Sequence, residues 1–339
     1  MTAPLSLSLA VCTYDRAPDL DRALAALGRQ RPAPGASWST LVVDNNSTDD
    51  TAAVVADHAE RGRVPGLRRV VEAEPGLTAA RRRAVLETRA DWVVFVDDDN
   101  LLRPDWVAEL AAAIRQHPDA GAVGGRVVPD WAAPPPPYVS AFAWAYAMQD
   151  HGPEPAEVDG LVGAGLAVRR AALVATGWLD RPLLADRVGR RLVSGGDVEI
   201  GQRLRGHGYA LRYHPGCVLD HRVPAERMGR PYLLRLLRGL GASAALASTL
   251  TWTGPEAEWV AHVRVQARQR AGWAARELGL ALRRRPGHGL TPALAWASFA
   301  AGMALGVRDV DRRTAPERAA LFGAALGRRL SPHTPPVLA

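Results

Sequence analysis

The stretch DWVVFVDDDN, residues 91–100, decides the fold. Val93 to Val96 are consecutive β-favouring apolar residues, so they predict a short buried strand that ends at three carboxylates. In an open α/β sheet, the carboxyl ends of the strands border the crevice where ligands bind. Adjacent Asp side chains repel one another unless a cation lies among them, and oxygen ligands suit Mg2+ or Mn2+. The stretch therefore predicts a sheet edge that holds a divalent ion and, through it, a phosphate-bearing ligand.

A solvated acidic turn is the alternative interpretation of the same triplet. In that case the carboxylates lead into a helix that begins near Pro104, and Asn100 or Asp105 helps to cap it. The motifs elsewhere in the chain decide between the two interpretations.

Two earlier strands are predicted to end at the same edge. Residues 5–11 alternate Leu or Val with small residues, which predicts a strand that ends at residues 13–16, TYDR. Residues 40–43 predict a second strand, which ends at Asp44 and a run of polar residues. A helix is expected after each strand, beginning at Asp19 and at Thr51. This alternation favours a parallel, doubly wound α/β sheet.

A third strand, residues 67–71, precedes a helix that begins at GLTAARRR, residues 76–83. The amide groups and arginines at its N-terminal end suit a pyrophosphate. The order of four motifs, TYDR (13–16), DNNS (44–47), GLTAARRR (76–83) and DDD (97–99), resembles family 2 glycosyltransferases of the GT-A fold. The resemblance implies a Rossmann-like mixed sheet, as in nucleotide-diphospho-sugar transferases, followed by a C-terminal helical extension.

The resemblance also implies roles for individual residues. A nucleotide-sugar donor would contact Thr13, Tyr14, Arg16, Asp44, Asn46, Arg81, Asp97 and Asp98. A Mn2+ or Mg2+ ion would be held by Asp99 and Asp97, with His221 as a further candidate ligand. Family members commonly show Ala-Arg-Asn where this chain has Ala-Arg-Arg, so Arg82 stands in the Asn position.

A second cluster, SGGDVE at residues 194–199, opens another predicted helix. The family usually has Gly-Glu-Asp there, and the resemblance makes Asp197 the catalytic base. Gly196 replaces the family's Glu, so any supporting role of that Glu is lost or passes to Glu199. By local geometry alone, a helix-capping role for Asp197 is favoured.

Charge and length divide the chain. With 339 residues it can hold two units, and its net charge of +7 conceals an asymmetry. Residues 1–221 contain 24 Arg and 28 acids, whereas residues 222–339 contain 18 Arg and 7 acids. We expect a catalytic domain over 1–225, with a donor half to about 128 and an acceptor half from about 129. A basic helical extension over 226–330 and a loose tail over 331–339 would follow.

The compartment is predicted from cysteine content and helix composition. Two cysteines, Cys12 and Cys217, cannot form a disulfide framework, so a reducing cytoplasm fits. The basic helices suggest peripheral contact with the inner face of a membrane. The uncharged run 289–307 favours a packed or interfacial helix over a membrane span. Nucleic acid is not an expected partner.

These observations predict a metal-dependent inverting glycosyltransferase that moves a sugar from a nucleotide-diphosphate donor to a hydroxyl acceptor. The acceptor would be a saccharide or a lipid-linked molecule of polysaccharide or glycoconjugate biosynthesis. A nucleotidyltransferase of related fold is one alternative, although it would place a Gly-rich basic loop directly after the first strand. A non-catalytic sugar-binding module is the other, because it would tolerate Gly196.

Overall fold

The computed structural model describes residues 5–184, 186, 192–285 and 288–322. The chain forms two compact units. Unit 1 comprises residues 1–130, 147–182 and 203–222, and unit 2 comprises residues 131–146, 183–202 and 223–339. The expected domain boundary at residue 225 stays a prediction, and the expected tail 331–339 lies outside the described residues.

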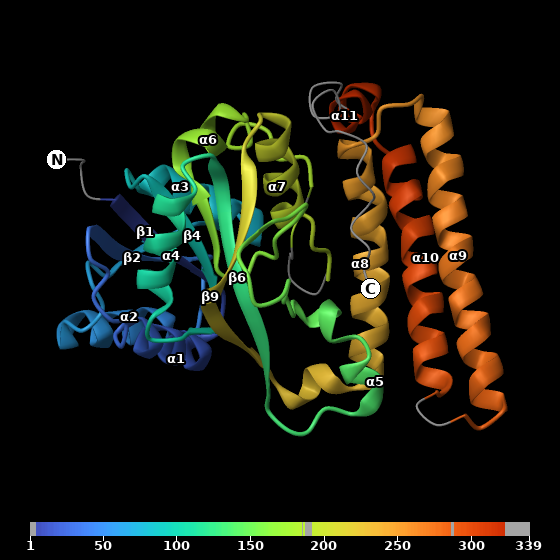
Figure 1. Ribbon diagram of the computed structural model, residues 1–339, viewed down its shortest axis with the longest axis horizontal. Coiled ribbons are helices and arrows are strands. Elements are labelled where there is room, and N and C mark those ends of the chain that lie inside the picture. The colour runs from blue at the N-terminus through green and yellow to red at the C-terminus, as the bar shows by residue number, and fades with distance from the viewer. Residues whose placement is uncertain (1–4, 185, 187–191, 286–287, 323–339) are drawn as a thin grey trace. The chain divides into compact units, whose positions relative to one another are not determined.

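A mixed sheet forms the framework of unit 1 (Figure 1). Its first four strands are parallel, in the order β3-β2-β1-β4: β1 (Leu5–Thr13), β2 (Ala36–Asp44), β3 (Arg68–Val71) and β4 (Trp92–Asp97). The order continues β8-β6-β9-β5, with β7 beside β9: β5 (Asn100–Leu102), β6 (Ala120–Trp131), β7 (Ala156–Glu157), β8 (Leu166–Arg169) and β9 (Ala210–Val223). Because β8 runs antiparallel to β4, the sheet is mixed, as the resemblance implies.

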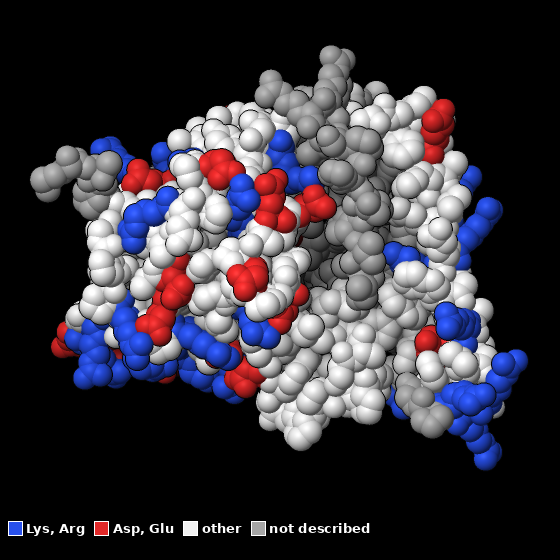
Figure 2. All heavy atoms as spheres, viewed as in Figure 1, with Lys and Arg blue, Asp and Glu red and all other residues white. Residues whose placement is uncertain are grey.

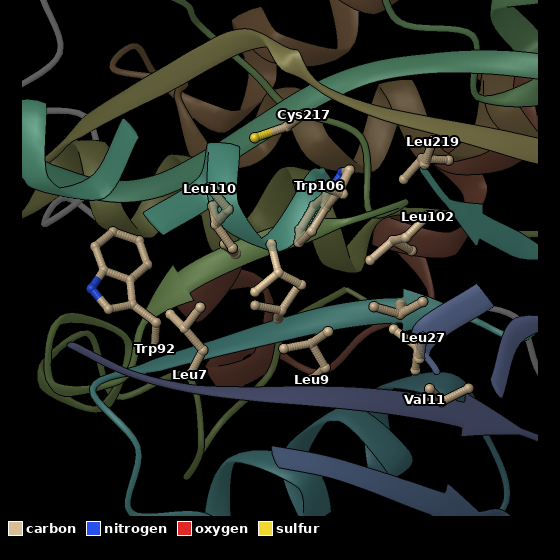
Figure 3. Close-up of a cluster of buried hydrophobic side chains, with 14 of the residues drawn as sticks. Leu7, Leu9, Val11, Leu27, Trp92, Leu102, Trp106, Leu110, Cys217 and Leu219 are labelled. Carbon is tan, nitrogen blue, oxygen red and sulfur yellow. The ribbon is translucent and has the colours of Figure 1, made fainter. Parts of the chain in front are cut away.

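Side-chain alternation builds the core of unit 1. Leu7, Leu9 and Val11 of β1 lie in register with the even-numbered residues of β4, and all are buried in one apolar cluster (Figure 3). The cluster also contains side chains from α1 (Ala17–Leu27) and α4 (Trp106–Gln116). Every second strand residue thus packs against the apolar faces of these helices. This burial fixes the register between β1 and β4, because a shift of one residue would turn the apolar side chains to the other side of the sheet.

Unit 1 has three further helices among the described residues. They are α2 (Thr51–Arg61), α3 (Leu77–Glu87) and α6 (Arg170–Ala175), and α3 packs against β1, β2 and β4. The helix α7 (Gly196–Gly206), whose residues 196–202 belong to unit 2, carries the second predicted motif.

Unit 2 has its own core, built mainly from helices. Its elements are α5 (Pro137–Ser140), the 3-10 turns η1 (Ala143–Tyr146) and η2 (Ala225–Met228), α8 (Arg230–Leu250), α9 (Glu256–Leu282), α10 (Leu290–Asp311) and α11 (Ala315–Leu321). The helix α10 lies between α8 and α9 and packs against both (Figure 1). Leu233, Leu236 and Leu237 of α8 are buried in this core. These leucines therefore serve helix packing rather than a surface.

Two described helices, α8 and α10, are long and apolar enough to cross a membrane. About half of each apolar window is nevertheless buried within the protein: 50% for α8 and 44% for α10. Core helices of soluble proteins share this pattern, so length and composition alone do not assign a membrane span here.

Candidate functional site

The carboxyl ends of β1, β2 and β4 bring the predicted donor residues to one edge of the sheet. Thr13 lies in register with Asp44 across β1 and β2, and Cys12 lies in register with Asp97 across β1 and β4. Each strand ends at the polar residue that the sequence places after its apolar run. The three motifs are therefore neighbours in space, as the parallel-strand prediction requires, while their roles stay predictions.

Asp98 and Asp99 are buried at this edge, and Arg16 approaches both of them. The guanidinium of Arg16 lies 3.5 Å from Asp98 Oδ1 and 3.3 Å from Asp99 Oδ2. Asp98 also accepts a hydrogen bond of 2.9 Å from the Thr13 hydroxyl. One cation therefore contacts two buried carboxylates, which leaves negative charge in excess.

The close approach of these charged groups shifts the pKa values of Asp98 and Arg16. Burial, together with repulsion from Asp99, raises the pKa of Asp98 to about 8, although Arg16 and the Thr13 hydroxyl act in the opposite direction. Burial would lower the pKa of Arg16, but attraction to Asp98, Asp99 and Asp19 raises it above its ordinary value. Arg16 therefore stays charged, while Asp98 is costly to ionise without a further cation nearby.

His221 joins the triplet from a distant part of the chain. It lies on β9 in register with Asn100 of β5, and its Nε2 is 3.4 Å from Asp99 Oδ1. The predicted ligands thus include one contacting pair. Among the described residues, however, no group of three or more His, Cys, Asp or Glu side chains is gathered as a metal cluster. Carboxylate and imidazole groups suit Mn2+ chemically, and a cation beside Asp98 would favour the ionised form of that carboxyl group.

Asp44 anchors the second motif. Its Oδ1 accepts the Ser47 N–H at 2.8 Å, and its Oδ2 accepts two bonds from Arg69 at 2.9 and 2.6 Å. Burial would raise the pKa of Asp44, but the hydrogen bonds from Ser47 and Arg69 hold it below its ordinary value. Tyr14 and Asn46 are exposed at the same edge. A ligand could therefore contact their side chains without displacing the core.

Arg81 is buried beneath the edge. Its Nη2 lies 3.6 Å from Asp97 Oδ1, and its guanidinium lies over the Phe95 ring at 5.4 Å. A Cβ on Gly163 would lie 2.6 Å from Arg81 Nη2, so glycine is what leaves room for this arginine. The neighbouring Arg82 donates to the Leu179 carbonyl at 2.8 Å, which gives it a structural contact.

Sequence reasoning missed Arg69, Asn45 and Gly163. The Asn45 side chain donates to the carbonyls of Glu72 and Glu74 and accepts the Gly76 N–H, so it ties the donor motif to the start of α3. Arg69 lies on β3, one strand away from Asp44, and only the strand register connects the two. The available sequence signal is an Arg in the short predicted strand that follows the strand ending at Asp44.

Asp197 is the second residue of α7 and is partly exposed. It belongs to unit 2, and its role as the catalytic base stays a prediction.

The surroundings of Gly196 leave no room for the Glu that the resemblance implies at this position. A Cβ at Gly196 would lie 2.2 Å from Asp186 Oδ2. Asp186 is buried, and its Oδ1 accepts the N–H groups of Gly195 at 3.1 Å and Gly196 at 3.0 Å. Glu199 is also buried and accepts the N–H groups of Leu183 and Leu184. Asp186 therefore occupies the space beside Gly196, and Glu199 anchors the preceding loop.

Comparison with known proteins identifies a family over part of the chain. Residues 8–173, which contain most of β1, all of β2 to β4 and the Asp triplet, match the profile described as glycosyl transferase family 2. The predicted resemblance to family 2 is therefore confirmed over this stretch, which we call the family 2 domain.

Two curated proteins resemble the family 2 domain. The glucosyl-dolichyl phosphate glucuronosyltransferase of Haloferax volcanii is 32% identical over 108 residues, covering 31% of this chain and 34% of that protein. An uncharacterized glycosyltransferase of Mycobacterium tuberculosis is 38% identical over 111 residues, covering 28% of this chain and 48% of that protein. The chain thus spans between a third and a half of these relatives.

Solved structures resemble the chain over most of its length. The mannosyltransferase PcManGT from Pyrobaculum calidifontis, solved in complex with GDP-Man and Mn2+, superposes with a TM-score of 0.58 at 21% identity. That match covers 89% of this chain and 87% of the mannosyltransferase. TarS of S. aureus, solved with UDP-GlcNAc, superposes with a TM-score of 0.50 at 15% identity, covering 90% and 92% of the two chains. At these identities the likeness establishes the GT-A fold of the family 2 domain.

Proposed function

We propose that the chain is a metal-dependent inverting glycosyltransferase that moves a sugar from a nucleotide-diphosphate donor to a hydroxyl group. The observation that carries the proposal is the meeting of Thr13, Asp44 and the Asp triplet at the carboxyl edge of a family 2 domain. Such an edge is where α/β sheets bind ligands. The excess of buried carboxylate there suits a substrate whose phosphates arrive with a divalent cation.

In the proposed donor site, some residues contact the nucleoside and others supply charge near the phosphates. Tyr14 and Asn46 offer exposed polar side chains to the nucleoside, and Asp44 offers a carboxylate held in place by Arg69. Arg16 and Arg81 supply positive charge beside the triplet. The donor would therefore meet acceptor groups at its nucleoside end and cations near its phosphates.

Asp99 and His221, with Asp97, are the residues that would hold Mn2+ or Mg2+ in this proposal. Bound there, the ion would supply stabilisation of the negative charge that grows on the leaving nucleoside diphosphate. Mn2+ accompanies the donor in the superposed mannosyltransferase, which supports a divalent ion without choosing it for this chain.

Asp197 is the proposed base. It would take the proton from the acceptor hydroxyl while the hydroxyl oxygen attacks the anomeric carbon from the face opposite the leaving diphosphate, which inverts that carbon. Asp186 and Glu199 support this assignment because they fix the loop and the first turn of the helix that carries Asp197. A saccharide or lipid-linked hydroxyl is the proposed acceptor, and the dolichyl phosphate in the name of the Haloferax relative supports the lipid-linked class.

A panel of nucleotide sugars tests the donor and the ion together. We expect one donor to raise the melting temperature in Mn2+ or Mg2+ but not in EDTA, because a ligand that binds the native state stabilises it. The Asp99→Asn variant should lose this shift. The control Asp57→Asn removes an exposed carboxylate of a surface ion pair, so it should keep the shift. An equal shift in EDTA would contradict the metal role.

Product analysis separates the proposal from its alternatives. Incubation of the donor with the enzyme, with and without hydroxyl acceptors, should release nucleoside diphosphate. Conversion of the donor and added pyrophosphate into a nucleoside triphosphate and a sugar 1-phosphate would instead identify a nucleotidyltransferase. Gly196, which stands where the family usually has Glu, favours a non-catalytic sugar-binding module as the second candidate. Donor binding without turnover for any acceptor would support that module.

A further inference from the structure

Large apolar side chains are exposed where α9 runs into α10. Leu282, Leu290 and Leu294 are 73%, 59% and 53% exposed. Trp273 and Leu278, in the last turns of α9, are exposed as well. A single exposed Leu is ordinary, but this many close together indicate a contact surface. We refer to residues 273–285 and 288–294 as the hairpin end.

The same hairpin end carries a concentration of positive charge. Arg276, Arg283, Arg284 and Arg285 are exposed, and no ion pair is recorded for them within the described part of the chain. Glu277 is the one acid that the sequence has between Trp259 and Arg308, and it contacts His288 at 2.8 Å. Figure 2 shows basic side chains over this end of unit 2. The surface is therefore suited to an anionic partner.

The backbone at the end of α9 adds an independent observation. Arg284 has a φ of 52°, which lies in the left-handed region. Its N–H donates to Ala281 O at 2.9 Å, and the N–H of Arg285 donates to Leu280 O at 3.1 Å, as in a Schellman cap. Glycine is the usual residue at this position because it adopts the left-handed conformation without strain. An Arg at this position keeps its guanidinium although the left-handed backbone conformation is strained for a residue other than glycine. Such strain is typical of functional positions.

We propose that the hairpin end docks on the surface of an anionic phospholipid bilayer. Leu282, Leu290 and Leu294 would enter the boundary between headgroups and acyl chains, and the arginines would pair with the lipid phosphates. A soluble polyanion would engage the arginines but leave the leucines in water. A second copy of the chain would bring equal positive charge against the same surface. The bilayer is the partner that uses both the apolar and the basic side chains, and this proposal does not depend on glycosyl transfer.

Cosedimentation with vesicles tests the charge. The full-length protein should pellet with vesicles of phosphatidylcholine mixed with phosphatidylglycerol at low salt, and not with phosphatidylcholine alone. A basic residue near such a surface contributes about fivefold to binding, so Arg283→Gln, Arg284→Gly and Arg285→Gln together should weaken it on the order of 100-fold. Glycine at 284 relieves the left-handed strain, so the fold should survive.

A matched control removes the same three charges from unit 1. Arg29, Arg63 and Arg89 are exposed, and their combined replacement by Gln should leave vesicle binding within about fivefold of the wild type. Equal losses in the two triple variants would overturn the proposal, because binding would then follow net charge alone. It would also be overturned if wild-type protein stayed in the supernatant, or if it dimerised without vesicles and the hairpin-end variant did not.

A fluorescent label tests the apolar contact. Cys12 and Cys217 are buried, so an exposed Cys introduced by Leu282→Cys can be labelled selectively. An environment-sensitive dye at position 282 should shift to the blue when anionic vesicles are added. The control Leu86→Cys, at a leucine of similar exposure on unit 1, should not shift. A shift at 86 without one at 282 would show that another surface meets the lipid.

Discussion

At the scale of single residues, Asp197 is the side chain on which the proposed chemistry depends. We expect Asp197→Asn to lower the turnover rate by about 10^2 to 10^4, because a well-placed general base contributes that much. The amide keeps the size of the carboxylate but cannot take a proton, so donor binding should stay near the wild-type level. Single-turnover transfer and donor titration measure the two effects separately. A variant with near-normal turnover would remove Asp197 from the mechanism.

Arg69 is expected to control the protonation of Asp44 and, through it, acid stability. The folded-state pKa of Asp44 lies below its ordinary value, so the carboxylate contributes stability above pH ~4 that is lost as the pH falls through the folded pKa. Arg69→Gln removes two charge-assisted hydrogen bonds and should lower the unfolding free energy at pH 7 by about 1 to 3 kcal/mol. Denaturant unfolding from pH 7 to pH 3 should show this difference shrinking. A difference that stays constant with pH would contradict the linkage.

At the scale of elements, the start of α7 requires a glycine at position 196. Gly196→Glu would place a Cβ 2.2 Å from Asp186 Oδ2, and overpacking of this kind costs about 1 to 3 kcal/mol. Asp186→Gly removes the obstacle and, with it, the acceptor for two backbone N–H groups. In a double-mutant cycle, the combined variant should be more stable than the sum of the single changes predicts. Strict additivity would mean that Asp186 does not exclude a side chain at 196.

The contact between α8 and α10 depends on glycine in the same way. A Cβ at Gly302 of α10 would lie 2.0 Å from Arg238 O of α8, whereas a Cβ at Gly272 of α9 would meet nothing within 4 Å. Both positions are helical, so Ala should gain roughly 1 kcal/mol of helix propensity at each. We therefore expect Gly272→Ala to raise the melting temperature and Gly302→Ala to lower it. Increases in both variants would show that the two helices can separate without cost.

At the scale of the whole molecule, the described residues form two separate apolar cores, one in each unit. Cooperative unfolding follows a shared core, so we expect calorimetry to resolve two transitions. Nucleoside diphosphate should raise the transition of unit 1, which contains the candidate donor residues, and Gly302→Ala should lower the other. A single transition that both treatments shift would indicate one cooperative unit.

Local patterns were enough to predict the sheet edge. The strands that end at Thr13, Asp44 and Asp97 follow from period-two or continuous apolar runs, and parallel strands bring their carboxyl ends together. The family profile confirms the resemblance that these motifs carry. This much needs only the order of residues along the chain, because each strand and its terminal polar group lie within a few positions of one another.

The remaining contacts depend on pairing between distant segments. Arg69 meets Asp44 through the β2–β3 register, and His221 meets Asp99 through the β5–β9 register. Asp186 fills the space beside Gly196 across a loop. The sequence by itself determined that the strands ending at Thr13, Asp44 and Asp97 form and which polar groups end them. Only the tertiary structure decided which charges neutralise them, because a counter-ion is chosen by distance in space and not by distance along the chain.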